Sequence, residues 1–535
     1  MRNFHFVILL LAVTLFLFFF KLGDMALTDP DETFYAQTAK EMLNAGEWVT
    51  PTIFGKPQFE KPVLYYWFVV ASYMVFGVSE FAARFPSVIL AIAGVLGVYF
   101  LGRLLFSPLC GFFSGLILAT CAQYIVLARA CVTDMALMTF ILFCLVFFLM
   151  GQATGKKTHY LISSAMAALA VLTKGPIGLF IPAVVVGLYV LLNRQWKKAF
   201  KGIPTFWCVL VFIAICLPWY LAVIRVHGSV FIAEFFGFQN ITRFLKPEHR
   251  IGDSALFYIP VIIAGFFPWS LFLPLGAWDM YRNRKASSRL KAPGLFLLIW
   301  FLTVFLFFSF SRTKLVTYIF PLFPVMALVT GRFWERFVLR GAEDKSVRKS
   351  MNISYIIFAV FGILAMVGIF FVVKHEYAQA TGGAILVTGV FAVGLSAAVV
   401  LFLCDKKILS FSSIVLAVVL LCVPLIIYIM PIIGEFESSK ALSFKVKEVS
   451  KPGEPLGGED DHRRGIAFYT DRTDIVDLHP YPDLMDFVSR KERVWCIIQS
   501  KHYRQLTENR PDNVSEPLFH SGKYVLITNM PDEGG

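Results

Sequence analysis

Charged residues are scarce in this chain. They make up 16% of its 535 residues, against about 25% in soluble globular proteins, while hydrophobic residues reach 57%. Apolar stretches of about 17–25 residues, the length that crosses a bilayer, recur nearly to residue 430. These features exclude a soluble enzyme, a fibrous protein and a disordered chain. The sequence predicts a polytopic α-helical membrane protein.

Cysteine is almost absent after residue 430, and the cysteines elsewhere are not spaced as a CxxC pair. Of the nine cysteines only Cys496 follows residue 430, so no disulfide can form within that last part, and no CxxC pair occurs anywhere. No basic helix with interleaved aromatic residues is present either. We therefore expect no nucleic-acid partner and no CxxC metal or redox site.

Hydropathy predicts thirteen membrane spans. The aromatic stretch Pro62–Gly77 is rich in Tyr and Trp, and we interpret it as an interfacial helix among outer juxtamembrane helices in 24–78. The spans are expected at 5–22, 83–105, 109–128, 135–152, 159–172, 176–193, 204–224, 256–276, 293–310, 315–332, 353–373, 383–404 and 408–430.

The distribution of charge predicts the orientation. The net charge of +13 divides into +17 for residues 1–430 and −4 for residues 431–535. With a cytoplasmic N-terminus, all six basic clusters fall on the cytoplasmic side, as the positive-inside rule requires. A span at Pro62–Gly77 would turn every later cluster outward. The clusters lie at Arg103, Lys156-Lys157, 194–201, 282–291, 332–349 and Lys406-Lys407.

Residues 431–535 are predicted to form a small soluble α/β domain on the outer side of the membrane, following a transmembrane domain over 1–430. Strands are expected at Gly465–Tyr469, Val494–Ile498 and Lys523–Thr528, with helical residues Leu484–Arg490 between them. No motif in this part indicates a catalytic role.

The first outer loop holds the main candidates for chemistry. A helix is expected there, with Asp29 as N-cap, Pro30 at the first helical position, Glu32 at the third and Gly46 or Asn44 at the end. Asp29 and Glu32 have a structural explanation in these caps. Asp31 has less of one, and from the first turn its carboxylate could reach an acceptor hydroxyl as a general base.

Further charged residues lie at the same face, where cations are unexpected and so indicate function. Prolines on both sides of Glu60-Lys61 prevent a regular helix, and Lys61 is suited to bind a lipid-linked phosphate. Arg129 and Asp134 could pair at the end of a span. The other candidates are Lys174 and the phosphate-binding Arg312 and Lys314, together with His249 as an acceptor contact.

These motifs resemble the ArnT-like branch of the protein-mannosyltransferase superfamily, which are GT-C glycosyltransferases that use polyprenyl-phosphate sugars. The resemblance covers residues 1–335 in order. It rests on Asp31-Glu32-x-x-Tyr35, Trp48-Val49-x-Pro51, Glu60-Lys61-Pro62, Glu80-Phe81-Ala82-Ala83-Arg84, Thr133-Asp134, Leu172-Thr173-Lys174-Gly175-Pro176, Asn240-Ile241-Thr242-Arg243-Phe244 with His249, Phe267-Pro268-Trp269-Ser270, and Ser311-Arg312-Thr313-Lys314 with Tyr318 and Pro321.

The resemblance implies a GT-C fold and a set of site residues. Asp31 would be the catalytic carboxylate. The lipid phosphate would be bound by Lys61, Arg243 and Tyr318. We add Arg312 and Lys314 to this group because of their position at the outer boundary of a span. The sugar and acceptor site would include Glu60, Tyr35, Glu32, His249 and Lys174.

Two positions depart from the ArnT-like pattern. Phe34 stands where the family commonly has Arg, and the His that the family commonly has near Asn240 is missing. We therefore assign no metal site, and a divalent metal cofactor stays open. The only cofactor-like ligand expected is the undecaprenyl-phosphate sugar itself, which agrees with the lack of a glycine-rich nucleotide loop.

The predicted function is an inverting transfer of a sugar, of the 4-amino-4-deoxy-L-arabinose type, from undecaprenyl phosphate to lipid A on the periplasmic face of a bacterial inner membrane. A hydroxyl acceptor would need Asp31 to take its proton, whereas a phosphate acceptor is already ionised. The alternatives are hexose transfer to protein or another glycan and, from a different class, a lipid or solute transporter. A monomer among membrane lipids is expected.

Overall fold

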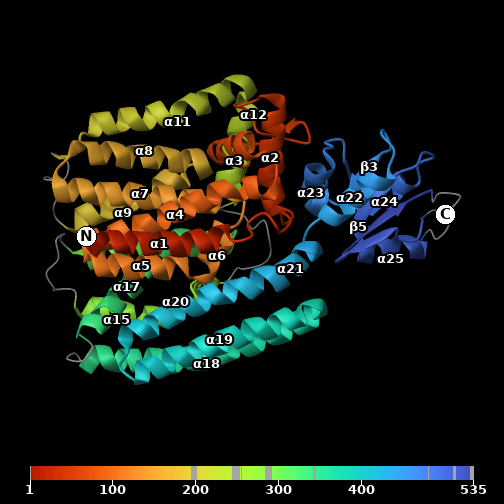
Figure 1. Cartoon of the computed structure of the whole chain (residues 1–535). Helices are drawn as coiled ribbons and strands as arrows, with labels where there is room; N and C mark the ends of the chain where they lie inside the picture. Colours follow the sequence, from red (N-terminus) through yellow and green to blue (C-terminus); the bar gives the residue numbers. More distant parts are fainter. Residues whose placement is uncertain are drawn as a thin grey trace.

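The computed structural model describes residues 2–193, 202–243, 254, 256–283, 292–340, 345–479, 481–509 and 514–530. Long helices run side by side as a bundle, and a smaller part that contains a β-sheet adjoins one end (Figure 1). The bundle helices are α1 (Arg2–Phe19), α4 (Glu80–Leu105), α5 (Pro108–Ala119), α6 (Ala122–Ala128), α7 (Thr133–Thr154), α8 (Lys157–Lys174), α9 (Ile177–Leu192), α11 (Thr205–His227), α14 (Tyr258–Gly265), α15 (Leu273–Arg282), α16 (Pro293–Phe310), α17 (Phe323–Arg340), α18 (Lys345–Glu376), α19 (Thr381–Leu403) and α20 (Lys407–Pro424).

Several of these helices have the properties of membrane spans. Among the described residues, seven are long and apolar enough to cross a membrane, and two more pairs, bent by 69° and 118°, could each form one span. Each predicted span overlaps a helix or a bent pair of helices. The prediction of a multi-pass helical membrane protein is confirmed, while the count of thirteen stays a prediction.

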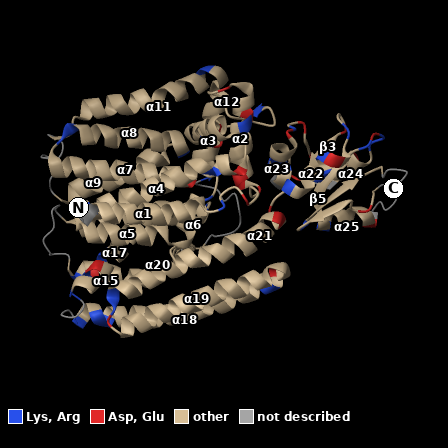
Figure 2. Ribbon diagram, viewed as in Figure 1, with Lys and Arg blue, Asp and Glu red and all other residues tan. Residues whose placement is uncertain are grey.

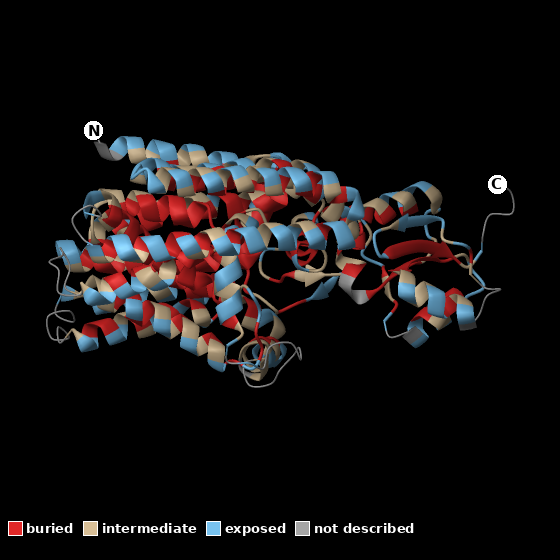
Figure 3. Cartoon of the chain, turned by 90° about the horizontal axis from the view of Figure 1, so that it is seen from below, coloured by how far each residue is buried: buried red, intermediate tan, exposed pale blue. Residues whose placement is uncertain are grey.

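Burial separates the central helices from those that face outward. Buried residues gather in the interior of the bundle (Figure 3). In the most apolar window of α7, 83% of the residues are buried, against 17% in α18. Helices α4 and α5 approach closely because Gly111 has no side chain: a Cβ there would lie 2.3 Å from the carbonyl oxygen of Tyr99. Small residues at such crossings let membrane helices pack backbone to backbone. The bundle thus holds a rigid centre within an apolar, outward-facing ring.

The first loop folds over one end of the bundle. Helix α2 (Asp31–Ala45) lies across the ends of the bundle helices, followed by a hairpin of β1 (Thr52–Ile53) and β2 (Lys56–Pro57) and by α3 (Leu64–Phe76) (Figure 1). Of the two predicted stops of α2, Gly46 is the observed one: it has φ +63° and its N–H bonds back to the last turn, whereas Asn44 lies within the helix. At the other end Asp29 does not cap α2: its Oδ1 accepts from the Thr33 hydroxyl at 2.6 Å, and its Oδ2 accepts from the backbone N–H of Ser439 at 3.0 Å.

Residues after the bundle form a five-stranded mixed sheet with the strand order β4-β3-β5-β7-β6. Pairs β3–β4 and β3–β5 are parallel, whereas β5–β7 and β6–β7 are antiparallel. The elements are α21 (Met430–Phe436), α22 (Lys440–Val449), β3 (Leu456–Gly458), α23 (Asp460–Thr470), β4 (Val476–Asp477), α24 (Tyr481–Val488), β5 (Trp495–Gln499), α25 (Ser500–Asn509), β6 (Phe519–Ser521) and β7 (Tyr524–Thr528).

One of the predicted strands is wrong. Gly465–Tyr469 lies in helix α23, although β5 and β7 fall at the other two predicted strands. The segment is apolar throughout because α23 is covered on two sides. Ile466 packs on the sheet, whereas Phe468 and Tyr469 join the large hydrophobic cluster of the first loop and the bundle. When a short helix is buried on two sides, its apolar residues do not recur with the helical period, so the sequence does not distinguish it from a strand.

Candidate active site

A cavity of about 310 Å³ lies where the first loop meets the bundle. Its walls come from residues 60 and 61, from α7, α8 and α9, from the π-helical segment η1 (Ile232–Thr242) and from the end of α16 with the segment that follows it. Five of the eleven predicted site residues line this cavity, namely Glu60, Lys61, Lys174, Arg243 and Tyr318. Loops separated by up to 258 positions in the chain therefore meet at one place.

Lys174 is held at the cavity wall by two contacts. It ends α8 next to the start of α7, and its Nζ donates a hydrogen bond to Asp134 Oδ1 at 2.7 Å. The same Nζ lies 5.4 Å from the centre of the Tyr318 ring. The predicted pairing of Asp134 with Arg129 is wrong, because Arg129 instead donates to the carbonyl oxygens of Leu17 and Phe18 at the end of α1.

Lys61 and Arg243 bring positive charge to the same cavity from different elements. The Lys61 Nζ donates to the carbonyl oxygen of Glu60 at 3.2 Å. Burial lowers the pKa of Lys61 to about 8, the Glu60 charge opposes this, and the nearby Lys174 and Arg243 lower it further. Arg243 Nη1 donates to Gln239 Oε1 at 2.6 Å, one turn back along the chain. Such a cluster of cations is suited to an anionic phosphate.

Asp31, the first residue of α2, lies near the cavity but is not among its lining residues. Its side chain reaches solvent. Desolvation raises the pKa of Asp31 above its ordinary value, and the negative charge of Asp134 raises it further, while Arg464 and Lys174 oppose the shift. Asp31 therefore shares an electrostatic environment with Asp134 and Lys174 of the cavity wall, which suits a carboxylate that acts beside a bound donor.

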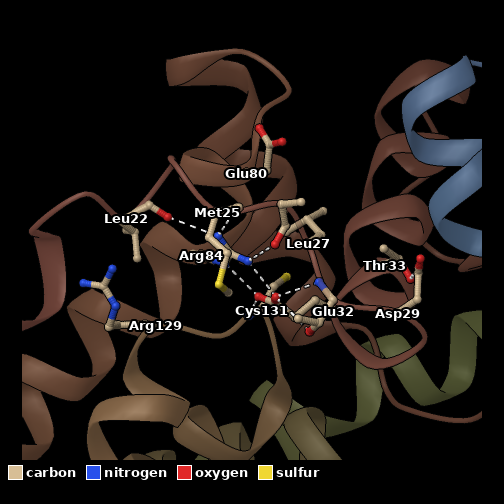
Figure 4. A network of polar contacts seen from close by, with 12 residues as sticks. Leu22, Met25, Leu27, Asp29, Glu32, Thr33, Glu80, Arg84, Arg129 and Cys131 are labelled. Carbon is tan, nitrogen blue, oxygen red and sulfur yellow. Dashed lines mark hydrogen bonds and ion pairs between the residues drawn. The ribbon is translucent and has the colours of Figure 1, made fainter. Parts of the chain in front are cut away.

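Glu32 has a structural place rather than one in the cavity. Its carboxylate is buried against Arg84 of α4, which donates from Nε to Oε1 at 2.8 Å and from Nη2 to Oε2 at 2.7 Å (Figure 4). The backbone N–H groups of Cys131 and Thr28 donate to the same two oxygens. Burial alone would raise the pKa of Glu32, but Arg84 and these N–H groups lower it overall. We therefore no longer assign Glu32 to the sugar and acceptor site.

Removing one partner of this pair should destabilise the protein. We expect Arg84→Met to cost about 3–5 kcal/mol, because it leaves Glu32 buried without compensation. The thermal unfolding midpoint of the purified protein in detergent would measure the loss. The double variant Glu32→Met/Arg84→Met should recover part of it, since two apolar side chains leave no charge unpaired. A wild-type midpoint for Arg84→Met would contradict the structural role.

The other predicted residues lie outside the cavity lining. Tyr35 is buried, with its hydroxyl 3.4 Å from the Thr133 hydroxyl. Lys314 is buried and its Nζ donates to the carbonyl oxygen of Ser311 at 2.8 Å, while Arg312 is exposed. Neither cation is thus brought to the cavity that Lys61 and Arg243 line. His249 lies outside the described residues.

The donor atoms at the site do not fit a protein-held metal ion. Within the described ranges, no three or more His, Cys, Asp and Glu side chains are grouped so as to hold one. The carboxylate of Asp134 is bound to the Lys174 ammonium, and that of Glu32 is fully used by Arg84 and backbone N–H groups. We derive no chemical step through a metal.

Sequence reasoning assigned no role in the site to two amide residues of the cavity lining or to one arginine beside the cavity. Gln239 and Asn240 line the cavity, and the spacing of four between Gln239 and Arg243 on one helical face was a signal that could have indicated the first. Arg464 of α23 reaches to 4.0 Å from Glu60 Oε1. Nothing in the local sequence around Arg464 indicates that contact, because it depends on how α23 docks.

Known proteins match this chain in sequence. The sequence profile of the dolichyl-phosphate-mannose-protein mannosyltransferase family matches residues 60–221. A protein of Aquifex aeolicus is 33% identical over 67% of this chain and 68% of its own length. The undecaprenyl phosphate-alpha-4-amino-4-deoxy-L-arabinose arabinosyl transferase of Edwardsiella ictaluri is 32% identical over 60% of this chain. The chain spans 58% of that relative's length.

A solved structure resembles the whole chain. The crystal structure of ArnT from Cupriavidus metallidurans bound to undecaprenyl phosphate has a TM-score of 0.81, covers 99% of both chains and is 23% identical. Fold and apolar helices place the chain in the class of multi-pass membrane proteins that are built like ArnT. It belongs to the ArnT-like branch of the protein-mannosyltransferase superfamily.

Proposed function

We propose that the protein transfers a sugar, of the 4-amino-4-deoxy-L-arabinose type, from undecaprenyl phosphate to lipid A at the periplasmic face of the inner membrane. The observation that carries this proposal is the convergence of Lys61, Lys174 and Arg243 on one cavity, with Asp31 at its edge. The names of the arabinosyl transferases that match the chain support the choice of donor and acceptor.

In the proposed reaction, an oxygen of the acceptor attacks the anomeric carbon of the donor sugar. The bond between that carbon and the phosphate oxygen breaks, and polyprenyl phosphate leaves with the electron pair. Lys61 and Arg243 stabilise the negative charge that grows on the leaving phosphate. Asp31 takes the proton of a hydroxyl acceptor or, beside an acceptor phosphate, stabilises the positive charge that develops on the sugar.

The orientation proposed here puts the cavity and residues 431–535 in the periplasm, with thirteen spans and a cytoplasmic N-terminus. Basic residues gather at the end of the bundle that also holds the N-terminus, away from the β-sheet (Figure 2). Positive charge concentrates on the cytoplasmic side of membrane proteins, which supports this orientation. We further propose that residues 431–535 form a soluble α/β domain and that the protein acts as a monomer.

The product of the reaction tests the function. Lipid A from cells with the gene should gain the mass of one aminopentose, and lipid A from cells without the gene, or with the Asp31→Asn variant, should not. Mass spectrometry of extracted lipid A makes the measurement. Unmodified lipid A together with newly glycosylated protein or another glycan would favour a hexose transferase, and the absence of any sugar-bearing product would contradict transferase activity.

A further inference from the structure

Helix α23, which belongs to the C-terminal part of the chain, is fixed against the first loop next to the cavity. The Asp29 carboxylate is buried between the two parts and lies 3.0 Å from His462 Nδ1, while the Ser439 hydroxyl donates to it at 2.9 Å. Lys40 of α2 donates to the carbonyl oxygen of Phe468 and to Asp471, both at 2.6 Å. These four contacts, all buried or partly buried, fix α23 and the residues before α22 against the first loop.

This docking places Arg464 at the rim of the site. Its guanidinium lies 4.7 Å from the centre of the Phe34 ring, and its Nη2 is 4.0 Å from Glu60 Oε1. Its charge also acts on Asp31, where it opposes the effect of Asp134. The side chain retains 27% exposure, so a molecule that arrives from solvent can reach it. Arg464 therefore faces the carboxylate proposed to act on the sugar.

The donor groups of Arg464 are not used within the described chain. No hydrogen bond joins its guanidinium to a described residue, and the separation from Glu60 exceeds hydrogen-bond length. A partly exposed ion pair at that distance adds little stability. In contrast, its neighbour Arg463 donates to Asp477 at 2.9 Å and to the carbonyl oxygen of Ile475 at 3.0 Å. Stacking on Phe34 orients the guanidinium of Arg464 while leaving its N–H groups available.

We propose that Arg464 binds an anionic phosphate of the acceptor, so that the C-terminal part supplies a residue of the acceptor site. A guanidinium matches a phosphate with two parallel hydrogen bonds. The donor phosphate has its own cations, because Lys61, Lys174 and Arg243 line the cavity whereas Arg464 lies outside that lining. Separate positive positions for the two phosphates suit a reaction in which both substrates carry phosphate.

This inference rests on the proposed function and adds the way in which the acceptor is recognised. An acceptor phosphate oxygen would form the new bond to the anomeric carbon as the bond to the polyprenyl phosphate breaks. The acceptor oxygen is already ionised, so no proton has to move, and Arg464 keeps its charge throughout. Arg464 would also offset the repulsion between the incoming phosphate and the carboxylates of Asp31 and Glu60.

The test compares Arg464→Gln with Arg464→Lys and with Arg490→Gln, in the full-length protein with undecaprenyl-phosphate-linked sugar as donor. Arg490 is a matched control, because it belongs to the same part of the chain and pairs with Glu492 at an exposed position. Steady-state transfer is measured with lipid A and with the same glycolipid after enzymatic removal of its phosphates. Thermal unfolding midpoints show whether each variant is folded.

We expect Arg464→Gln to raise the KM for lipid A by about ten- to a hundredfold, the range for losing hydrogen bonds to a charged group, while the donor KM changes less than twofold. Arg464→Lys should recover part of the loss, and Arg490→Gln should match the wild type.

An unchanged lipid A KM in folded Arg464→Gln, or an equal rise in the donor KM, would overturn the inference and leave the proposed function intact. The inference would also be overturned if the wild-type protein transferred sugar to the dephosphorylated glycolipid as efficiently as to lipid A. Failure of the wild type to modify either glycolipid would instead refute the proposed function.

Discussion

Replacing Asp31 by Asn is expected to lower the rate of sugar transfer at least about a hundredfold while the protein still inserts and folds. The substitution keeps the shape of the side chain but removes the negative charge that we place beside the reacting sugar. Loss of one preorganised charged or hydrogen-bonding group at a reaction centre typically costs about 10²–10³ in kcat. Turnover of the donor by the purified variant, with lipid A as acceptor, gives the measurement.

The control for this substitution is Asp24→Asn, which removes a carboxylate from the same loop. Asp24 pairs with Lys21 at an exposed position, so we expect its loss to leave turnover unchanged. The pH profile offers an independent check. Because the pKa of Asp31 is raised, its active, ionised form is lost on acidification at a higher pH than for an ordinary aspartate. This acid limb should disappear in Asp31→Asn, and wild-type turnover by the variant would remove Asp31 from the mechanism.

The second large effect is expected from Lys61→Gln, which removes a partly buried cation from the cavity that we assign to the donor phosphate. We expect the donor KM to rise by about a hundredfold, since truncating one partner of a desolvated charge pair costs several kcal/mol. The lipid A KM should change little. Kinetics with donor and acceptor varied in turn separate the two constants.

Lys56→Gln is the matched control, because Lys56 lies in the same loop with its side chain exposed. In the wild type, donor affinity should weaken as the pH rises through about 8, where Lys61 loses its proton. This alkaline loss should be absent in Lys61→Gln. If Lys61→Gln and Lys56→Gln bound the donor equally well, the assignment of the phosphate site would be contradicted.

Much of the membrane part could be predicted because its signals are local. Span positions follow from the length of apolar runs, and the end of α2 follows from Gly46, whose φ of +63° a glycine adopts easily. The grouping of Lys61, Lys174, Arg243 and Tyr318 came from a resemblance in sequence order. The cavity that these residues line agrees with that grouping.

What could not be predicted depends on contacts between distant segments. Glu32 looked available for a ligand because its partner, Arg84, lies 52 positions further along the chain. Gly465–Tyr469 resembled a strand because the first loop covers the side of α23 that would otherwise be polar. Arg464 gained its place beside Glu60 only through that same docking. Local patterns do not determine such tertiary contacts.

The central claim is that the cavity cations hold the lipid phosphate of the donor next to Asp31. Electron cryomicroscopy of the full chain with undecaprenyl phosphate tests it most directly. The account predicts density for the phosphate at hydrogen-bond distance, about 2.7–3.2 Å, from Lys61 Nζ and the Arg243 guanidinium, with the Asp31 carboxylate facing it. A phosphate bound outside this cavity, or on the opposite side of the membrane from Asp31, would contradict the claim.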